Sequence, residues 1–305
     1  MQHADPTTYP ARFRQHGERL DGTPAPMHVW PGAGGLPIAG DVWGDPKSPL
    51  VVLLHGGGQT RHAWKGSGEQ LAGTGYRVVA FDARGHGDSG WDPELRYTQD
   101  AMVEDLRCVI AAVGGVRPAL VGASMGGVVS MIAAGEGHVE ASSLVLVDIA
   151  PRVEPSGVQK IMEFMQQKPD GFDSLEEVAQ AIMNYQPHRT RPRNLDGLAK
   201  NVRRMSNGKY RWHWDPRRHS GGVDRATVQE RLEEAARSLK LPTLLVRGGL
   251  SDIVSEQSVR EFLALCPHAE YVDVPDAAHM VAGDRNDIFG ETVARFLARH
   301  LPVRS

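Results

Sequence analysis

A chain of 305 residues is long enough to form one large α/β domain and to bury a substantial core. Its hydrophobic fraction of 41%, charged fraction of 23% and net charge of −3 are those of an ordinary globular protein, and they give no reason to expect binding to nucleic acid or to an anionic membrane. The sequence shows no membrane-spanning run and no signal-peptide pattern, so we expect a cytoplasmic protein. Two cysteines imply no disulfide framework.

The first predicted elements are an N-terminal arm and a hairpin. Residues 1–27 are polar and interrupted by four prolines, which is typical of a segment laid over a surface. Residues 27–43 predict a β-hairpin, with the glycine-rich residues 32–35 as its turn.

From residue 50 onward the chain alternates between short apolar runs and helical patterns. Near-continuous apolar runs bounded by turn residues are typical of strands buried on both faces of a parallel sheet. Between two of these runs, Thr98 is the expected N-cap of a helix whose apolar residues recur every three or four positions. The runs predicted as strands are residues 50–54, 77–81, 119–121 and 144–147.

The alternation stops near Pro151 and resumes after Arg237. Between these positions we find only short helical patterns, such as a capping box that begins at Ser174 and an apolar stripe from Leu195 to Met205. A helical cap inserted into an α/β core is the simplest interpretation.

The core resumes with two further strands, each followed by a helix. These strands are predicted at residues 243–246 and 271–274. The expected organisation is an N-terminal arm (1–27), a first core part (28–150), a helical cap (151–237) and a second core part (238–305).

The motif Gly122-Ala123-Ser124-Met125-Gly126 is the most informative feature of the chain. It follows an apolar run and opens a helix of small residues, which is the strand, sharp turn and helix that a nucleophile elbow requires. The glycines permit a strained turn and close packing of helix on strand, so that the hydroxyl of Ser124 stands exposed. We therefore predict Ser124 as a nucleophile.

A serine hydroxyl is a poor nucleophile at neutral pH and needs a base, together with an acid that orients the base. His279 is the expected base and Asp252 the expected acid, because each directly follows a predicted strand at the edge of the sheet where ligands bind. Asp148 also follows a strand and is an alternative acid that the sequence leaves open. The preferred interpretation of Asp148 is structural: its side chain caps or braces the beginning of the helical cap.

Acyl transfer also requires N–H donors for the oxyanion. The N–H of Met125, directly after the nucleophile, is one expected donor. The second is expected from the run His55-Gly56-Gly57-Gly58 after the first central strand, and Gly57 is the predicted donor. We expect His55 and the polar loop 82–88 to be structural.

These motifs resemble those of α/β-hydrolases with a helical cap, in particular carboxylesterases and the epoxide-hydrolase and meta-cleavage-product-hydrolase branch. The resemblance implies a mostly parallel, doubly wound sheet and the chain order Ser124, Asp252, His279 for the catalytic triad. Epoxide hydrolases of this branch carry Asp as nucleophile; the serine at position 124 argues against epoxide opening. The resembling segments are residues 54–58, 81–89, 122–127, 248–254 and 278–283.

The predicted cap combines many cations with aromatic residues. Ten Lys or Arg stand between residues 188 and 218 against two Asp, and most are expected to form a solvated face. A second interpretation is that one or two of them, with Arg211 as the candidate, meet an anionic group on a substrate. Met205, Trp212 and Trp214 are the expected apolar walls of the pocket.

The expected function is a serine carboxylic-ester hydrolase that acts through an acyl-enzyme on a small to medium-sized ester. An anionic aromatic mono-ester, such as a monoalkyl phthalate, would suit a basic cap with tryptophans. The alternatives are a C–C bond hydrolase of the meta-cleavage-product type, a lactonase or a perhydrolase, all with the same triad. A ligand-binding protein of the same fold is the non-enzymatic alternative.

No cofactor is expected. The chain has neither an HExxH motif nor a CxxC pair for a metal, and it lacks the glycine patterns that bind nucleotides. The expected partner is a small-molecule ester, with no nucleic acid and no membrane, and the sequence carries no signal for an oligomeric state.

Overall fold

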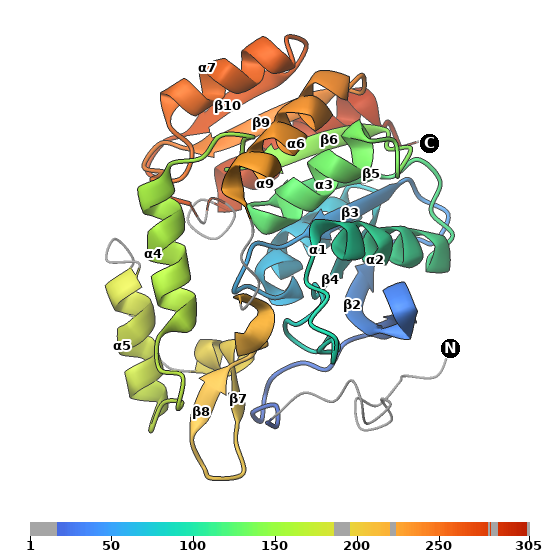
Figure 1. Cartoon of the computed structure of the whole chain (residues 1–305). Coiled ribbons are helices and arrows are strands. Elements are labelled where there is room, and N and C mark those ends of the chain that lie inside the picture. The colour runs from blue at the N-terminus through green and yellow to red at the C-terminus, as the bar shows by residue number, and fades with distance from the viewer. Residues whose placement is uncertain (1–16, 186–195, 220–223, 280, 282–285, 304–305) are drawn as a thin grey trace.

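A mostly parallel, eight-stranded sheet forms the centre of the structure (Figure 1). The computed structural model describes residues 17–185, 196–219, 224–279, 281 and 286–303. The strand order is β1-β2-β4-β3-β5-β6-β9-β10; β2 is antiparallel to β1 and β4, and all other neighbours are parallel. The strands are β1 (His28–Pro31), β2 (Pro37–Trp43), β3 (Leu50–Leu54), β4 (Arg77–Phe81), β5 (Ala119–Ala123), β6 (Ser143–Val147), β9 (Thr243–Gly248) and β10 (Glu270–Val274). The predicted fold class is confirmed.

Every apolar run predicted as a strand forms a strand of this sheet. The predicted hairpin is β1–β2, and its glycine-rich turn contains the 3-10 helix η3 (Ala33–Gly35). Of the predicted N-terminal arm, residues 1–16 lie outside the described residues. The described part makes two backbone hydrogen bonds of 2.8 Å between Glu18 and Arg204.

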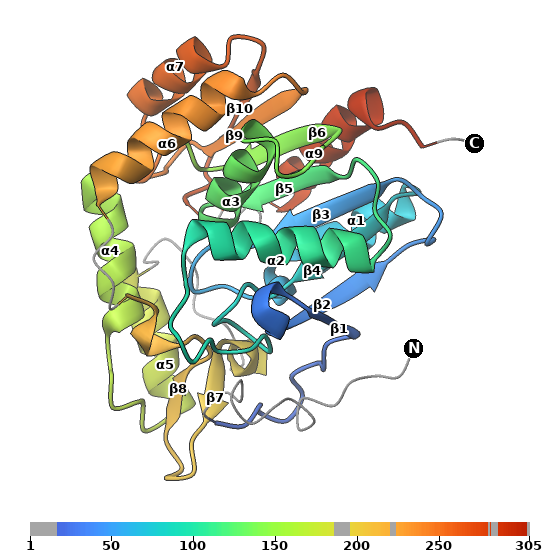
Figure 2. The ribbon, with the colours of Figure 1, turned by 45° about the vertical axis from the view of Figure 1, so that its right-hand side comes forward.

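Helices cover both faces of the sheet (Figure 2). Successive residues of the buried strands point to opposite faces: Val52 and Leu54 pack in one hydrophobic cluster, and Val51 and Leu53 pack in the other. None of the helices in the described ranges is both long and apolar enough to cross a membrane. The first cluster contains α2 (Gln99–Ala112), α3 (Met125–Gly135), α6 (Arg225–Ser238) and α7 (Glu256–Leu265), and the second contains α1 (Lys65–Gly73) and α9 (Asn286–His300).

Between β6 and α6 the chain leaves the sheet, and residues 151–224 are called here the inserted segment. Figures 1 and 2 both show this segment beside the sheet, with α4 and α5 next to a two-stranded hairpin. Its elements are α4 (Pro155–Gln166), α5 (Leu175–Tyr185), η5 (Asp196–Asn201), β7 (Val202–Arg204), β8 (Tyr210–Trp212) and η6 (Pro216–His219).

Both helix starts predicted from capping residues are confirmed. The hydroxyl of Thr98 accepts a hydrogen bond from the Ala101 N–H at 3.3 Å, at the start of α2. The hydroxyl of Ser174 accepts one from the Glu177 N–H at 3.2 Å, at the start of α5. Each side chain satisfies an amide that the helix itself leaves without a partner.

The prediction that this segment contains only helices is wrong. The apolar stripe from Leu195 to Met205 reaches β7, which pairs with β8 in an antiparallel hairpin, while Leu195 itself lies outside the described residues. Residues 205–208 form the turn, which the Gly208 N–H closes by donating to the Met205 carbonyl at 2.9 Å. Gly208 has a φ of +83°, a conformation that glycine adopts without strain. This turn chemistry outweighs the helical spacing of the apolar residues.

Helix α6 was predicted as the last part of the cap, but it packs on the core. Its residues Leu232, Ala235 and Ala236 belong to the same hydrophobic cluster as α3. Gly135 of α3 lies so close to α6 that an added Cβ would stand 2.3 Å from the Ala235 carbonyl oxygen. The part of the chain that leaves the core therefore ends before α6.

A buried cluster of charges ties the inserted segment and the loops to the sheet. Arg61, in the 3-10 helix η4 (Arg61–Trp64), has a side chain that is 0% exposed. Its guanidinium lies 3.0 Å from Asp41 of β2, 2.6 Å from Asp82 after β4 and 2.9 Å from Asp88. Asp88 also lies 2.9 Å from Arg203 of β7, so the cluster reaches the inserted segment.

Asp82 is the centre of this cluster. Burial, the largest single influence, would raise the pKa of its carboxyl, but the Arg61 guanidinium, nearby histidines and a backbone hydrogen bond from Asp88 together outweigh burial and hold this pKa well below the usual range. The carboxylate also accepts hydrogen bonds from the N–H groups of Arg61 and Asp88, at 2.7 and 2.8 Å. Asp82 is therefore a buried carboxylate whose charge is stabilised by Arg61 together with backbone amides.

Three buried histidines hold the glycine-rich loop 56–58 after β3. His55 pairs through Nδ1 with the Gly56 carbonyl at 2.8 Å, and His86 accepts from the Gly58 N–H at 3.3 Å. His213 of the inserted segment donates through Nε2 to the Gly58 carbonyl at 3.2 Å and accepts at Nδ1 from the Gly87 N–H at 2.8 Å. Burial lowers the pKa of all three, in His213 to about 3, so the rings are neutral.

We expect Arg61→Met to destabilise the fold strongly, because it removes the cation from the buried carboxylates of Asp41 and Asp82 and one of the cations from Asp88. The free energy of unfolding should fall by about 3–5 kcal/mol in urea denaturation. Lys65→Met removes the exposed pair of Lys65 with Glu69, whose side chains are 60% and 49% exposed, and should cost less than about 1 kcal/mol. Equal losses in the free energy of unfolding would contradict the conclusion that the buried charges contribute more to stability than the exposed pair.

Stability should also decrease in mild acid. Below the ordinary histidine pKa of 6.5, the unfolded chain binds protons that the buried histidines do not, so linkage lowers the free energy of unfolding as the pH falls. The maximum slope is about 1.4 kcal/mol per pH unit for each histidine. Urea unfolding between about pH 7.5 and pH 5.5 measures this slope, and His213→Gln should reduce it. An unchanged slope in that variant would refute a neutral His213.

Candidate active site

Ser124 lies at a sharp bend between β5 and α3. Its φ of +47° and ψ of −115° are strained for a residue with a side chain. Two glycines permit the bend: an added Cβ would lie 2.4 Å from the Gly126 carbonyl oxygen at Gly122, and 2.3 Å from the Leu54 carbonyl oxygen at Gly126. Strand and helix therefore meet at backbone distance, and the bend presents the serine side chain at the carboxyl edge of the sheet.

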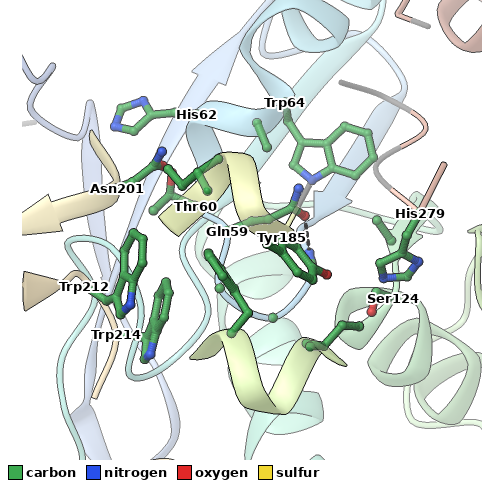
Figure 3. A pocket seen from close by; sticks show the side chains of 18 of the residues that line it. Gln59, Thr60, His62, Trp64, Ser124, Tyr185, Asn201, Trp212, Trp214 and His279 are labelled. Atoms are coloured by element: carbon green, nitrogen blue, oxygen red, sulfur yellow. Dashed lines mark hydrogen bonds between the residues drawn. The ribbon is translucent and has the colours of Figure 1, made fainter. Parts of the chain in front are cut away.

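His279 faces this serine. Figure 3 shows the hydroxyl of Ser124 directed toward the His279 imidazole, and both residues line one cavity. His279 Nδ1 lies 2.7 Å from Asp148 Oδ2. Because a carboxylate only accepts, Nδ1 carries the proton in this bond, which leaves Nε2 of the neutral ring as an acceptor.

Asp148 is held rigidly in place directly after β6. Its side chain is 0% exposed, and its backbone has a φ of +49°. Besides His279, the carboxylate accepts from the Gly248 N–H at 3.0 Å and from the Ser251 hydroxyl at 2.6 Å. These bonds fix the carboxylate that orients the imidazole.

The prediction of Asp252 as the partner of His279 is wrong. Asp252 is 48% exposed and pairs with Lys160 of α4 at 2.8 Å. The loop after β9 contacts the site through Ser251, whose hydroxyl donates to Asp148, while the next residue, Asp252, points toward the surface. Asp148, the alternative that the sequence left open, makes the hydrogen bond to His279.

The glycine loop leaves one N–H available beside the serine. The Gly56 N–H donates to the Gln59 side chain at 2.8 Å, and the Gly58 N–H donates to His86 at 3.3 Å. Within the described residues, no acceptor is found for the N–H of Gly57 or of Met125, the first residue of α3. Gly57 and Ser124 line the same cavity, and Met125 directly follows Ser124, so both predicted donors lie close to this serine.

The cavity beside Ser124 has a volume of about 240 Å³ and mostly apolar walls. Trp212 and Trp214, as predicted, line it; their rings are stacked with centroids 5.0 Å apart and planes at 12°. Phe164 of α4 and Tyr185 of α5 complete the aromatic wall. The sequence did not identify these two, although both lie on amphipathic helices.

The structure does not bring Met205 and Arg211 to this cavity. Met205 lies at the hairpin turn, where its N–H donates to the Lys209 carbonyl at 2.8 Å. The Arg211 guanidinium lies over the ring of Trp91, 5.2 Å from its centroid. Neighbouring residues of a strand point to opposite sides, so Arg211 faces away from the side that Trp212 and Trp214 line.

The comparison with protein families agrees with this geometry. Residues 49–285 match the family described as the alpha/beta hydrolase fold. This range contains the bend at Ser124 and the residues Asp148 and His279.

Two curated relatives are similar over most of their length. The chain is 29% identical to esterase Rv0045c of Mycobacterium tuberculosis over 249 residues, 80% of this chain and 80% of the relative. It is 29% identical to the 3-hydroxybutyrate-oligomer hydrolase of Cupriavidus necator over 250 residues, which are 78% of this chain and 85% of the relative.

Solved structures show the same fold. The structure of esterase Rv0045c has a TM-score of 0.71 and 29% identity, covering 90% of this chain and 93% of that chain. The structure of E-2-(acetamidomethylene)succinate hydrolase has a TM-score of 0.76 at 22% identity, covering 88% of this chain and 99% of that chain. The family match establishes that the chain belongs to the α/β-hydrolase family, and its esterase and hydrolase relatives identify it as an ester hydrolase.

Proposed function

We propose that this chain is a serine carboxylic-ester hydrolase that works through an acyl-enzyme. The main support is the line of hydrogen-bonding groups Ser124, His279 and Asp148 at the floor of one cavity, with the serine at a strained bend. In this proposal Asp148 replaces Asp252 as the third member of the triad.

In the first step, His279 Nε2 takes the proton of the Ser124 hydroxyl while the serine oxygen attacks the ester carbonyl. The N–H groups of Gly57 and Met125 donate to the carbonyl oxygen as it becomes an oxyanion. The protonated His279 then gives its proton to the departing alcohol. Asp148 stabilises the imidazolium and keeps Nδ1 as the donor.

In the second step, water attacks the acyl-enzyme. His279 Nε2 takes one proton of the water, the oxyanion forms again in the same two-amide site, and the acid leaves as Ser124 regains its proton. The inserted segment acts as the cap over this site, because Trp212 and Trp214 from it line the cavity.

A small to medium-sized ester with an apolar or aromatic acyl group suits the cavity best. The stacked tryptophans offer flat apolar walls, and aromatic groups pack favourably against such rings. An anionic aromatic mono-ester, such as a monoalkyl phthalate, remains the proposed substrate type. Its charge has to be met by a cation other than Arg211, whose guanidinium covers Trp91.

Ser124→Ala should abolish ester hydrolysis, because it removes the nucleophile. We expect the rate with p-nitrophenyl butyrate to fall by roughly 10⁴-fold or more, with an unchanged circular dichroism spectrum. Ser206→Ala changes an exposed serine and should keep the full rate. Substantial hydrolysis by a folded Ser124→Ala variant would overturn the proposed mechanism.

Asp148→Asn should lower kcat by roughly 10²–10⁴-fold, because the amide donates to His279 Nδ1 and forces the proton onto Nε2. Asparagine tolerates a positive φ, so the backbone at this position should be preserved. Asp252→Asn is the matched control and should change kcat by less than about twofold, because this side chain is exposed. The opposite order of effects would restore Asp252 as the triad acid.

A further inference from the structure

The apolar cavity contains one cation. Of the described residues that line it, Lys200 is the single Lys or Arg, and none is Asp or Glu. Lys200 belongs to η5 and is partly buried, and its amino group makes no ion pair or hydrogen bond within the described part of the chain. A cation in an apolar cavity without a carboxylate is ready to receive an anion from a ligand.

The surroundings of Lys200 add hydrogen-bonding groups at the same end of the cavity. Figure 3 shows Thr60, His62 and Asn201 grouped together, away from Ser124 and His279. Burial, with smaller contributions from charges that include Arg61 and Lys200, lowers the pKa of His62 to about 4. His62 is therefore neutral at pH 7 and leaves Lys200 as the charge at this end.

Two other cations near the cavity are already paired with carboxylates. Arg203 pairs with Asp88 at 2.9 Å, and Arg217 pairs with Asp215 at 2.7 Å. Arg218 has no carboxylate partner within the described ranges: its guanidinium lies 3.1 Å from the Met125 sulfur and its Nε is buried without a hydrogen bond, but Arg218 does not line the cavity. Among the described residues that line the cavity, Lys200 is thus the one that carries a positive charge.

The position of His279 decides which part of a substrate reaches Lys200. In the proposed function the departing alcohol takes its proton from His279 and must lie beside that ring. The tryptophan wall and the polar end lie on the other side of Ser124 (Figure 3), so the acyl group extends toward them.

We propose that Lys200 binds a carboxylate at the far end of the acyl group, so that the preferred substrates are half-esters of dicarboxylic acids. This inference rests on the proposed esterase function. The apolar walls hold the middle of the acyl group, and the ion pair selects its end, in a cavity where walls of low dielectric strengthen the attraction.

The test compares the monoethyl esters of glutaric, adipic and pimelic acids with their diethyl esters, with rates per ester group measured by chromatography of the released acid. For the best-fitting length, wild type should prefer the half-ester by roughly tenfold or more in kcat/KM. Lys200→Met should lose this preference, because it raises KM for the half-ester much more than KM for the diethyl ester. Lys200→Arg should keep the preference.

Lys209→Met is the matched control, because it removes an exposed lysine of the same segment that pairs with Asp173 at 2.9 Å. It should keep the preference. Equal rates for both ester types in wild type, or a preference that survives Lys200→Met, would overturn the role of Lys200. If Arg218→Met alone abolished the preference, Arg218 would bind the carboxylate and the proposal would fall.

Ser124→Ala, measured with both ester types, distinguishes a failure of the half-ester inference from a failure of the proposed esterase function. Hydrolysis that needs Ser124 but shows no preference leaves the esterase intact and refutes the half-ester inference. Hydrolysis that survives in the folded Ser124→Ala variant, or its absence in wild type, refutes the proposed function and the inference together.

Discussion

The pairing of one buried arginine with three buried carboxylates is the constraint on which the remaining structure depends. A fully buried guanidinium is tolerable only with its charge compensated, so Arg61 fixes Asp41, Asp82 and Asp88 around itself. Asp41 lies in β2, Asp82 and Asp88 lie in the loop after β4, and Arg61 lies in η4 after the glycine loop. Because Asp88 also binds Arg203, the inserted segment is fastened to the same point.

The glycine loop is rigid for a related reason. Neutral histidines satisfy its carbonyl and amide groups on both sides, so the free amide beside Ser124 keeps its direction without help from a substrate. In the proposed mechanism, a donor that is already aimed at the developing charge need not reorganise during the reaction. The strain at Ser124 is held by backbone contacts of the neighbouring glycines, so packing orients the Ser124 side chain and hydrogen bonds orient the glycine loop.

The sheet, the bend at Ser124 and the approach of Gly57 and His279 to one cavity were predictable, because each follows from a local pattern: an apolar run, a glycine motif or a loop directly after a strand. The carboxylate beside His279 was not, since Asp148 and Asp252 both follow strands and only the folded loop directs one of them inward. The hairpin β7–β8 was missed because helical spacing was weighted above the turn at residues 205–208. The sequence could not distinguish Arg211 from Lys200 as a cation for the cavity, because only the folded segment places Lys200 of η5 at the cavity and Arg211 over Trp91.

Residues 212–214 have a different role on each side of the chain, one toward the cavity and one toward the core. The tryptophans form a wall of the cavity, while His213 between them binds the loops of the core. Since neighbouring side chains in an extended chain point in opposite directions, a change of shape on one side leaves the attachment on the other side untouched. Substitutions at Trp212 or Trp214 can therefore change the shape of the cavity without weakening the attachment of the inserted segment to the core through His213. This separation lets one fold acquire new substrate specificities by single substitutions.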